Sequence, residues 1–110
     1  MRLAPKPFEM IKSGRKTFEL RLFDEKRREI LAGDGIIFTN TLTGESLRTE
    51  VVALHRFDSF EKLYASLPLL KCGYTSDDVC TADPSDMEAY YSKEKQKEYG
   101  VLGIELSVTL

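Results

Sequence analysis

The chain has few of the side chains that usually bind metals. It contains a single histidine, His55, and two cysteines, Cys72 and Cys80. A structural zinc site generally needs four nitrogen or sulfur ligands, and His55 lies far from both cysteines in the sequence. Two small residues in or near a loop explain the cysteines better, and in a cytosolic protein we expect free thiols. Ser-His-Asp, Cys-His and phosphate-loop patterns are also missing, so we expect neither a metal nor another cofactor.

Long apolar stretches are missing as well. No run approaches the roughly 20 residues that a membrane-spanning helix needs, and residues 1–7 lack the apolar segment of a signal peptide. We therefore expect a cytoplasmic protein without a membrane partner. The length of 110 residues predicts one domain over residues 1–110. With 42% hydrophobic and 31% charged residues, the composition is ordinary for a globular protein.

A basic segment is present on an otherwise acidic chain. Residues 12–28 hold seven basic and three acidic residues, a local net charge of +4, whereas the whole chain carries −2 and the remainder therefore −6. Such a patch suggests local contact with an anionic partner rather than general adhesion to nucleic acid. The alternative is a solvated basic surface that binds nothing.

Hydrophobic periodicity predicts three helices and four strands. A short helix over residues 7–14 begins at a proline and ends at Gly14, where a left-handed conformation is suitable. Strict alternation over residues 16–23 predicts a half-buried strand with Thr17, Glu19 and Arg21 on its polar face. Further elements are expected as strands over residues 35–40, 47–57 and 101–108, a helix over residues 60–67, and a helix from residue 84 that restarts near Ser92 and ends at Gly100.

The fold class follows from the order of these elements. Residues 41–45 contain Gly44 and predict a hairpin turn. The centre of the 47–57 strand is apolar on both faces and should lie inside the sheet. Hairpin signals outnumber strand–helix–strand signals, so we expect an α+β fold: a small, curled, mostly antiparallel sheet or β-barrel with helices at its rim.

Two motifs connect the sequence to a known family. Residues 14–21 have the pattern Gly-x-Lys-x-x-Glu-x-Arg, and a Gly33-Asp34 turn opens the next apolar strand. Together with the apolar C-terminal segment 100–106, they resemble the ASCH domain, a family of the PUA-like superfamily of small β-barrels. The resemblance covers essentially the whole chain, so residues 1–110 are interpreted as a single domain of this kind.

The resemblance implies a cleft beside the first predicted strand, lined by the polar motif, and RNA as the partner. One branch of small bacterial members instead hydrolyses the amide of N4-acetylcytidine with a lysine, a threonine three residues later and a more distant glutamate. Carried over, the lysine falls on Lys16, but Glu19 stands at the threonine position. A carboxylate does not replace a hydroxyl nucleophile readily, so this departure favours binding over catalysis.

Lys16, Glu19 and Arg21 are the main site candidates. Glu19 and Arg21 share one face of a strand, where Glu19 can accept a hydrogen bond from an amino group and Arg21 can hold a phosphate or carbonyl. A partly desolvated Lys16 can act as a base or bind a phosphate. A regular strand places Lys16 on the opposite face, so it joins the others only if the chain bends near Thr17. The alternatives are an edge lysine and a structural ion pair.

Further candidates lie outside this motif. Lys26 and Arg28 can extend an anion-binding surface along a nucleic-acid backbone, or form a solvated surface. Tyr90 and Tyr91 can stack on a base, although tyrosines at helical spacing are more often core residues. His55 is expected to be structural.

The sequence therefore predicts a domain that binds RNA or a modified nucleoside or nucleotide. The alternative is a hydrolase, either an N4-acetylcytidine amidohydrolase or a ribonuclease, with Lys16 and Glu19 as the catalytic residues. A protein-interaction module without a ligand is a third and weaker interpretation.

Overall fold

A computed structural model describes residues 1–109 of the chain. Within this range the sheet has five strands in the spatial order β1-β3-β4-β5-β2. The elements along the chain are β1 (Arg2–Leu3), α1 (Pro5–Lys12), β2 (Phe18–Leu22), α2 (Glu25–Arg28), β3 (Gly35–Asn40), β4 (Ser46–Phe57), α3 (Phe60–Ser66), the 3₁₀ turns η1 (Leu69–Lys71), η2 (Val79–Thr81) and η3 (Pro84–Ala89), α4 (Lys93–Tyr99) and β5 (Val101–Val108).

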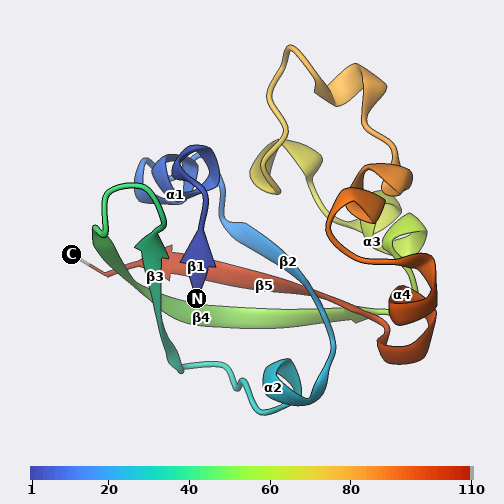
Figure 1. The fold of residues 1–110 in the computed structure, drawn as a ribbon, viewed down its shortest axis with the longest axis horizontal. Helices are drawn as coiled ribbons and strands as arrows, with labels where there is room; N and C mark the ends of the chain where they lie inside the picture. Colours follow the sequence, from blue (N-terminus) through green and yellow to red (C-terminus); the bar gives the residue numbers. More distant parts are fainter. Residues whose placement is uncertain (110) are drawn as a thin grey trace.

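The fold is a curled half-barrel of the α+β class, as the sequence predicted. Strands β3, β4, β5 and β2 pair in antiparallel fashion, and only the short β1 pairs in parallel, with β3. Figure 1 shows α1 over one end of the sheet, α3 and α4 at the other, and α2 at the turn after β2. Strand β4 lies in the middle of the sheet, which confirms its predicted interior position.

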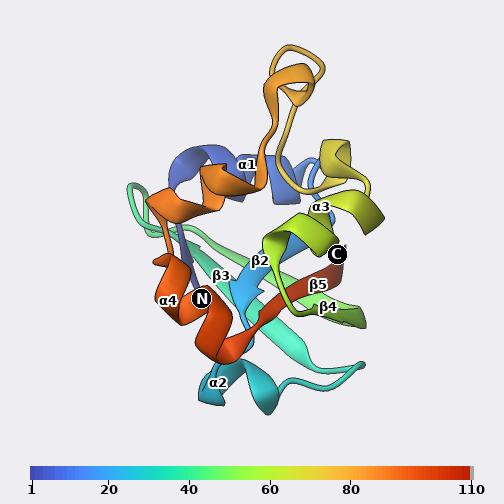
Figure 2. The same ribbon diagram turned by 90° about the vertical axis from the view of Figure 1, so that its right-hand side faces the viewer.

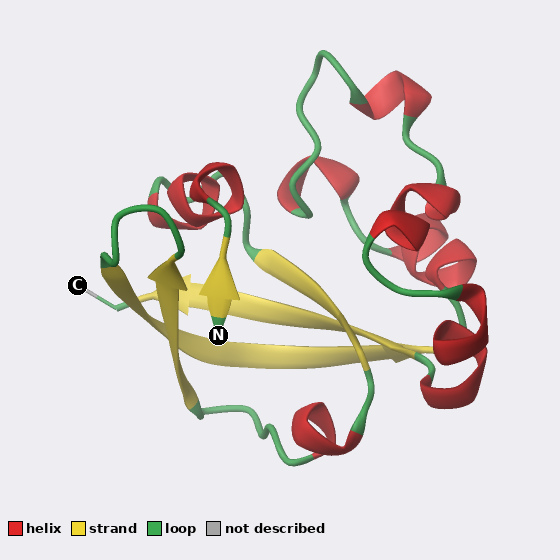
Figure 3. Ribbon diagram, in the orientation of Figure 1, coloured by secondary structure: helices red, strands yellow, loops and turns green. Residues whose placement is uncertain are grey.

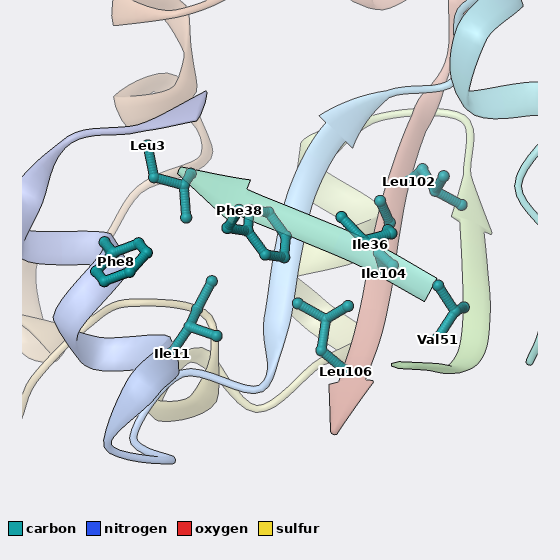
Figure 4. Close-up of a cluster of buried hydrophobic side chains, with 9 residues drawn as sticks. All are labelled: Leu3, Phe8, Ile11, Ile36, Phe38, Val51, Leu102, Ile104 and Leu106. Atoms are coloured by element: carbon teal, nitrogen blue, oxygen red, sulfur yellow. The ribbon is translucent and has the colours of Figure 1, made fainter. Parts of the chain in front are cut away.

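Two buried hydrophobic clusters hold the elements on the sheet. The first cluster joins α1 to the sheet through Phe8 and Ile11, which meet Phe38 of β3 and Ile104 of β5 (Figure 4). The second cluster joins α3, η3 and β2 through residues such as Phe60, Leu63, Met87 and Leu20. Because β2 contributes Phe18, Leu20 and Leu22 to the second cluster, Glu19 and Arg21 point to the other side of the sheet.

Several boundaries differ from the sequence prediction. The first helix begins at Pro5 rather than at the second proline, and β1 was not predicted, because two residues are too few to show a periodicity. The predicted strand over residues 16–23 is shorter, and both of its faces are buried rather than one. The helix expected after Asp83 is a 3₁₀ turn with a capping box that ends at Ala89.

The segment between α3 and α4 contains no long helix or strand. It carries the three 3₁₀ turns and rises away from the sheet, as Figures 2 and 3 show. It is nevertheless fixed to the rest of the fold, because the Thr17 N–H donates a 2.9 Å hydrogen bond to the Lys71 carbonyl and Cys72 is buried. This hydrogen bond brings the segment beside the start of β2.

Candidate functional site

A cleft of about 540 Å³ opens between α1, β1, β2 and the segment of residues 72–91. Its wall carries four basic side chains, Arg2, Lys6, Lys16 and Arg21, and three acidic ones, Glu19, Asp78 and Asp86. The motif that the sequence singled out therefore lies in the wall of a cleft large enough for a small-molecule ligand. Tyr64, Tyr74, Tyr90 and Tyr91 add aromatic surface to the same cleft.

Lys16, Glu19 and Arg21 form one connected ion cluster. The Lys16 ammonium donates a 2.7 Å hydrogen bond to Glu19 Oε1. Arg21 donates through Nε and Nη2 to Glu19 Oε2, at 3.0 and 2.8 Å. Glu19 thus accepts from both cations, and the cluster as a whole carries a net charge of +1.

Lys16 reaches Glu19 because the chain is not yet a regular strand at this point. Gly14 adopts a φ of 82°, and the Lys16 N–H donates back to the Met10 carbonyl. The next N–H, that of Thr17, donates to Lys71 rather than to β5. The bend that Lys16 needed in order to join Glu19 and Arg21 is therefore present just before β2.

Glu19 is buried but ionised. Its exposed fraction is 4%. Burial alone would raise the pKa of its carboxyl, but the charges and hydrogen bonds of Lys16 and Arg21 hold that pKa below its usual value. At neutral pH Glu19 is therefore an acceptor and not a proton donor, and Oε1 keeps one lone pair that no group within residues 1–109 uses.

Cys72 and Gly73 pack against Lys16 from the opposite wall. Gly73 has a φ of 114°, and a Cβ atom at this position would lie 3.7 Å from Lys16 Cδ and 3.9 Å from Nζ. Burial raises the pKa of the Cys72 thiol to about 11, although the Lys16 charge opposes this shift. Cys72 is therefore an uncharged part of the wall, and the two sides of the cleft touch at Lys16.

A chain of hydrogen bonds crosses that opposite wall. The hydroxyl oxygens of Tyr64 and Tyr74 are 2.7 Å apart, and Tyr74 donates a 2.6 Å hydrogen bond to Asp86 Oδ2. The two rings meet edge to face, with centroids 5.8 Å apart. Burial raises the pKa of both phenols, so both hydroxyls keep their protons at neutral pH.

The two tyrosines predicted as stacking residues both line the cleft, but in different environments. Tyr91 is partly buried, stacks on Phe60 with ring centroids 6.2 Å apart, and lies close to Arg21. Tyr90 is 75% exposed. Tyr90 therefore does not belong to the core, whereas Tyr91 supports both the core and the cleft.

Lys26 and Arg28 lie outside the cleft, on α2. Both are exposed. Arg28 donates to the Phe23 carbonyl and lies over the Phe23 ring, 5.1 Å from its centroid, and Arg56 approaches the same ring at 4.4 Å. These side chains form a separate basic surface beyond the end of β2.

Metal-binding groups do not gather in the described part of the chain. Among residues 1–109, no three His, Cys, Asp or Glu side chains lie close enough together to hold an ion. His55 forms a 2.9 Å contact with Glu105 and packs near the Phe18 ring, outside the cleft. Over the same residues, no helix has the length and apolar character that crossing a membrane requires.

Sequence reasoning missed the wall that contains Tyr64, Tyr74 and Asp86. The spacing of Tyr64 placed it on the apolar face of a helix, and residues 69–82 had no periodicity from which to orient Tyr74. The sequence predicted a helix start at residue 84, and the structure shows a capping box there in which Asp86 is the acidic partner. No local signal indicated that this partner also lines a cleft.

Comparison with known proteins places the fold. The model of the ASCH domain matches residues 1–109. The chain belongs to the ASCH domain family. This ASCH domain is similar to the crystal structure of the hypothetical protein PH0355, with 32% identity, a TM-score of 0.81, and coverage of 99% of this chain and 96% of that one. It is also similar to the solution structure of protein PF0455 from Pyrococcus furiosus, with 28% identity, a TM-score of 0.71, and coverage of 98% and 97%. No curated protein matches it.

Proposed function

We propose that the cleft of this ASCH domain binds a nucleotide, either free or within a strand of RNA. The observation that carries the proposal is the convergence of Lys16, Glu19 and Arg21 in one cleft with Tyr90 and Tyr91. Membership of the ASCH family supports a nucleic-acid ligand. The local charge of +4 over residues 12–28 supports an anionic one.

The donor groups of the ion cluster suit phosphate and carbonyl oxygens. Lys16 and Arg21 each keep N–H groups beyond those they give to Glu19, since an ammonium has three N–H groups and a guanidinium has five. Lys16 and Arg21 are held in place by the buried carboxylate, so a ligand does not need to order them. Arg21 can offer paired N–H groups to a phosphate, which strengthens such contacts.

Tyr90 provides an aromatic surface for a base. At 75% exposure its ring is open to solvent, and an aromatic platform contributes about 1–3 kcal/mol per stacked base in single-stranded nucleic-acid complexes. Tyr91 lies next to it, with ring centroids 6.5 Å apart. The ion cluster offers donors to the phosphate or to the base carbonyl of a nucleotide, and the exposed Tyr90 ring offers a stacking surface to the base.

Fluorescence anisotropy with labelled single-stranded RNA of mixed sequence, at low salt, tests the proposal. We expect binding that weakens as salt increases and that falls roughly tenfold or more in Lys16→Ala, which removes a charged hydrogen-bond donor. The matched control is Lys62→Ala, because Lys62 is an exposed lysine of α3 that pairs with Asp58 at the surface, outside the cleft wall.

Tyr90→Ala serves as a second variant in case Lys16→Ala folds poorly, because an exposed side chain contributes little to stability. The proposal fails if wild type binds neither RNA nor mononucleotides at low salt. It also fails if binding is unchanged in both Lys16→Ala and Tyr90→Ala.

A hydrolase that uses the same pair remains the alternative. Within the described residues, the cleft wall contains no serine or threonine, and Thr17 lines a different pocket beside β5. The lowered pKa of Glu19 suits a base rather than an acid. We expect no product when N4-acetylcytidine or RNA is incubated with the protein and separated by chromatography. Product that disappears in Lys16→Ala would favour the enzyme instead.

A further inference from the structure

The hydroxyl protons along the Tyr64–Tyr74–Asp86 chain have a fixed direction. A carboxylate only accepts, so Tyr74 must use its single hydroxyl proton in the 2.6 Å bond to Asp86. In the 2.7 Å contact between the phenols, Tyr64 must then be the donor. The protons therefore all point along the chain toward Asp86.

As a result, this wall offers acceptors and no free hydroxyl donor. Tyr64 oxygen keeps its lone pairs, and Tyr74 oxygen keeps the one that Tyr64 does not use. Asp86 Oδ2 accepts from Tyr74 and from the Asp83 N–H, whereas Oδ1 has no donor among the residues that the structure describes. Raised phenol pKa values keep both protons in place at neutral pH.

The facing wall is mainly a donor surface, because Lys16 and Arg21 only donate and Glu19 Oε1 is its one carboxylate oxygen with a spare lone pair. The two walls are close, since Tyr74 directly follows Gly73, and a Cβ atom on Gly73 would lie 3.9 Å from Lys16 Nζ. A ligand between them is complementary when one edge carries oxygen or ring-nitrogen acceptors and the other carries N–H donors.

We propose that the cleft selects nucleobases that carry an exocyclic amino group, with their acceptors on Lys16 and Arg21 and the amino group on Asp86 and the tyrosine oxygens. Cytosine presents this arrangement and uracil does not, because uracil has a carbonyl where cytosine has the amino group. In the same way, guanine carries an exocyclic amino group and hypoxanthine, the base of inosine, lacks it. This inference rests on the proposed function, since it specifies the ligand of the same cleft.

Calorimetric or fluorescence titration with cytidine and uridine monophosphate, and with guanosine and inosine monophosphate, tests the selection. We expect the amino-bearing member of each pair to bind roughly 10- to 100-fold more tightly, the range for a hydrogen bond to a charged group. Oligocytidine and oligouridine RNA repeat the comparison in a strand. A preference for the amino-bearing base in either form supports the inference.

Asp86→Asn is the decisive variant. It keeps an oxygen acceptor for Tyr74 but adds an amide donor, so we expect the preference to vanish or reverse while uridine monophosphate still binds. Asp77→Asn is the matched control, because Asp77 is an exposed acid of the same segment outside the cleft wall, and it should keep the preference. Circular dichroism confirms that both variants fold.

The outcomes separate the two proposals. Equal binding by wild type in both the mononucleotide and the oligonucleotide comparison, or an unchanged preference in Asp86→Asn, overturns the selection and leaves nucleotide binding intact. If no nucleotide or RNA binds, both proposals fall.

Discussion

The Lys16 ammonium lies 2.7 Å from the Glu19 carboxylate, although a regular strand would place these two side chains on opposite faces. The bend before β2 brings them together, and Arg21 completes the cluster from the same face as Glu19. Because Glu19 is 4% exposed and Lys16 is 9% exposed, this ion pair is both a structural element and a preformed part of the cleft wall.

Glu19→Gln should destabilise the fold by about 3 kcal/mol at neutral pH, since removing one partner of a buried ion cluster leaves uncompensated buried charge. Urea denaturation at equilibrium measures the difference. The Glu19 pKa is lower in the folded state than its ordinary value of 4.5. Its contribution is therefore complete above about pH 4.5 and is lost as the pH falls through the folded pKa. A difference between wild type and Glu19→Gln that stays constant from neutral pH to about pH 2 would contradict this interpretation.

Gly73→Ala should lower stability by about 1–2 kcal/mol, because an L-residue at positive φ is strained. It should also weaken RNA binding, since Gly73 packs against Lys16. Gly44→Ala is the matched control, because Gly44 also has a positive φ, of 76°. A Cβ atom on Gly44 would meet no atom within 4 Å, and Gly44 lies in the turn before β4, outside the cleft. Equal reductions of binding in both variants would show that the effect comes from stability alone.

The two cysteines should differ strongly in reactivity. Cys80 is exposed, whereas Cys72 is buried with a thiol pKa raised to about 11. Under native conditions at about pH 8, iodoacetamide should modify Cys80 first, because the thiolate is the reactive form. Peptide mass spectrometry identifies the modified site, and denaturant should remove the difference. Rapid native modification of Cys72 would mean that the wall beside Lys16 opens readily.

Tyr90→Ala and Tyr91→Ala should separate binding from folding. Tyr90→Ala should change stability by less than about 0.5 kcal/mol and still weaken RNA binding by roughly tenfold, because the base then has no ring to stack on. Tyr91→Ala removes a ring that stacks on Phe60 and should lower the thermal midpoint as well. Thermal melting and anisotropy titration on the same samples measure both effects. If Tyr90→Ala binds RNA with the same affinity as wild type, the Tyr90 ring is not the surface on which the base stacks.

The basic surface of α2 should matter for a strand but not for a single nucleotide. Lys26→Ala and Arg28→Ala remove exposed charges outside the cleft. Each should reduce the slope of log affinity against log salt for single-stranded RNA by about 0.7 for every phosphate that the removed side chain neutralises. Mononucleotide affinity should stay unchanged. A weaker mononucleotide complex would place these residues beside the cleft ligand after all.

The local sequence pattern was sufficient to predict an element where that element is long and has clear ends. Strand β5 occupies residues 101–108 as predicted, because Gly100 ends the preceding helix and an apolar run follows. Strand β1 was missed because a two-residue strand is specified by its partner β3 rather than by its own sequence. The predicted convergence of Lys16 with Glu19 and Arg21 required a bend that the strand pattern did not contain.

The wall that contains Tyr64, Tyr74 and Asp86 could not be predicted from the sequence for another reason. Tyr74 and Asp86 are twelve residues apart, in a segment whose path is set by contacts with Lys16, Thr17 and Tyr64. Such tertiary contacts leave no periodic trace in the sequence. Burial of the Glu19 face of β2 was unexpected for a similar reason, since alternation shows which side chains share a face but not what covers it.

The cleft has a consequence for motion because its lining residues come from elements packed in different hydrophobic clusters: α1 contributes Lys6 and Pro7, and η3 contributes Asp86 and Met87. Helix α1 is anchored in the first cluster, whereas α3 and η3 are anchored in the second, and the sheet beneath them is shared. A bound nucleotide that contacts both groups of lining residues would link α1 to α3 and η3 and reduce their motion relative to one another. Its signature would be slower amide hydrogen exchange in α1 and η3 together, although these elements lie about seventy residues apart in the chain.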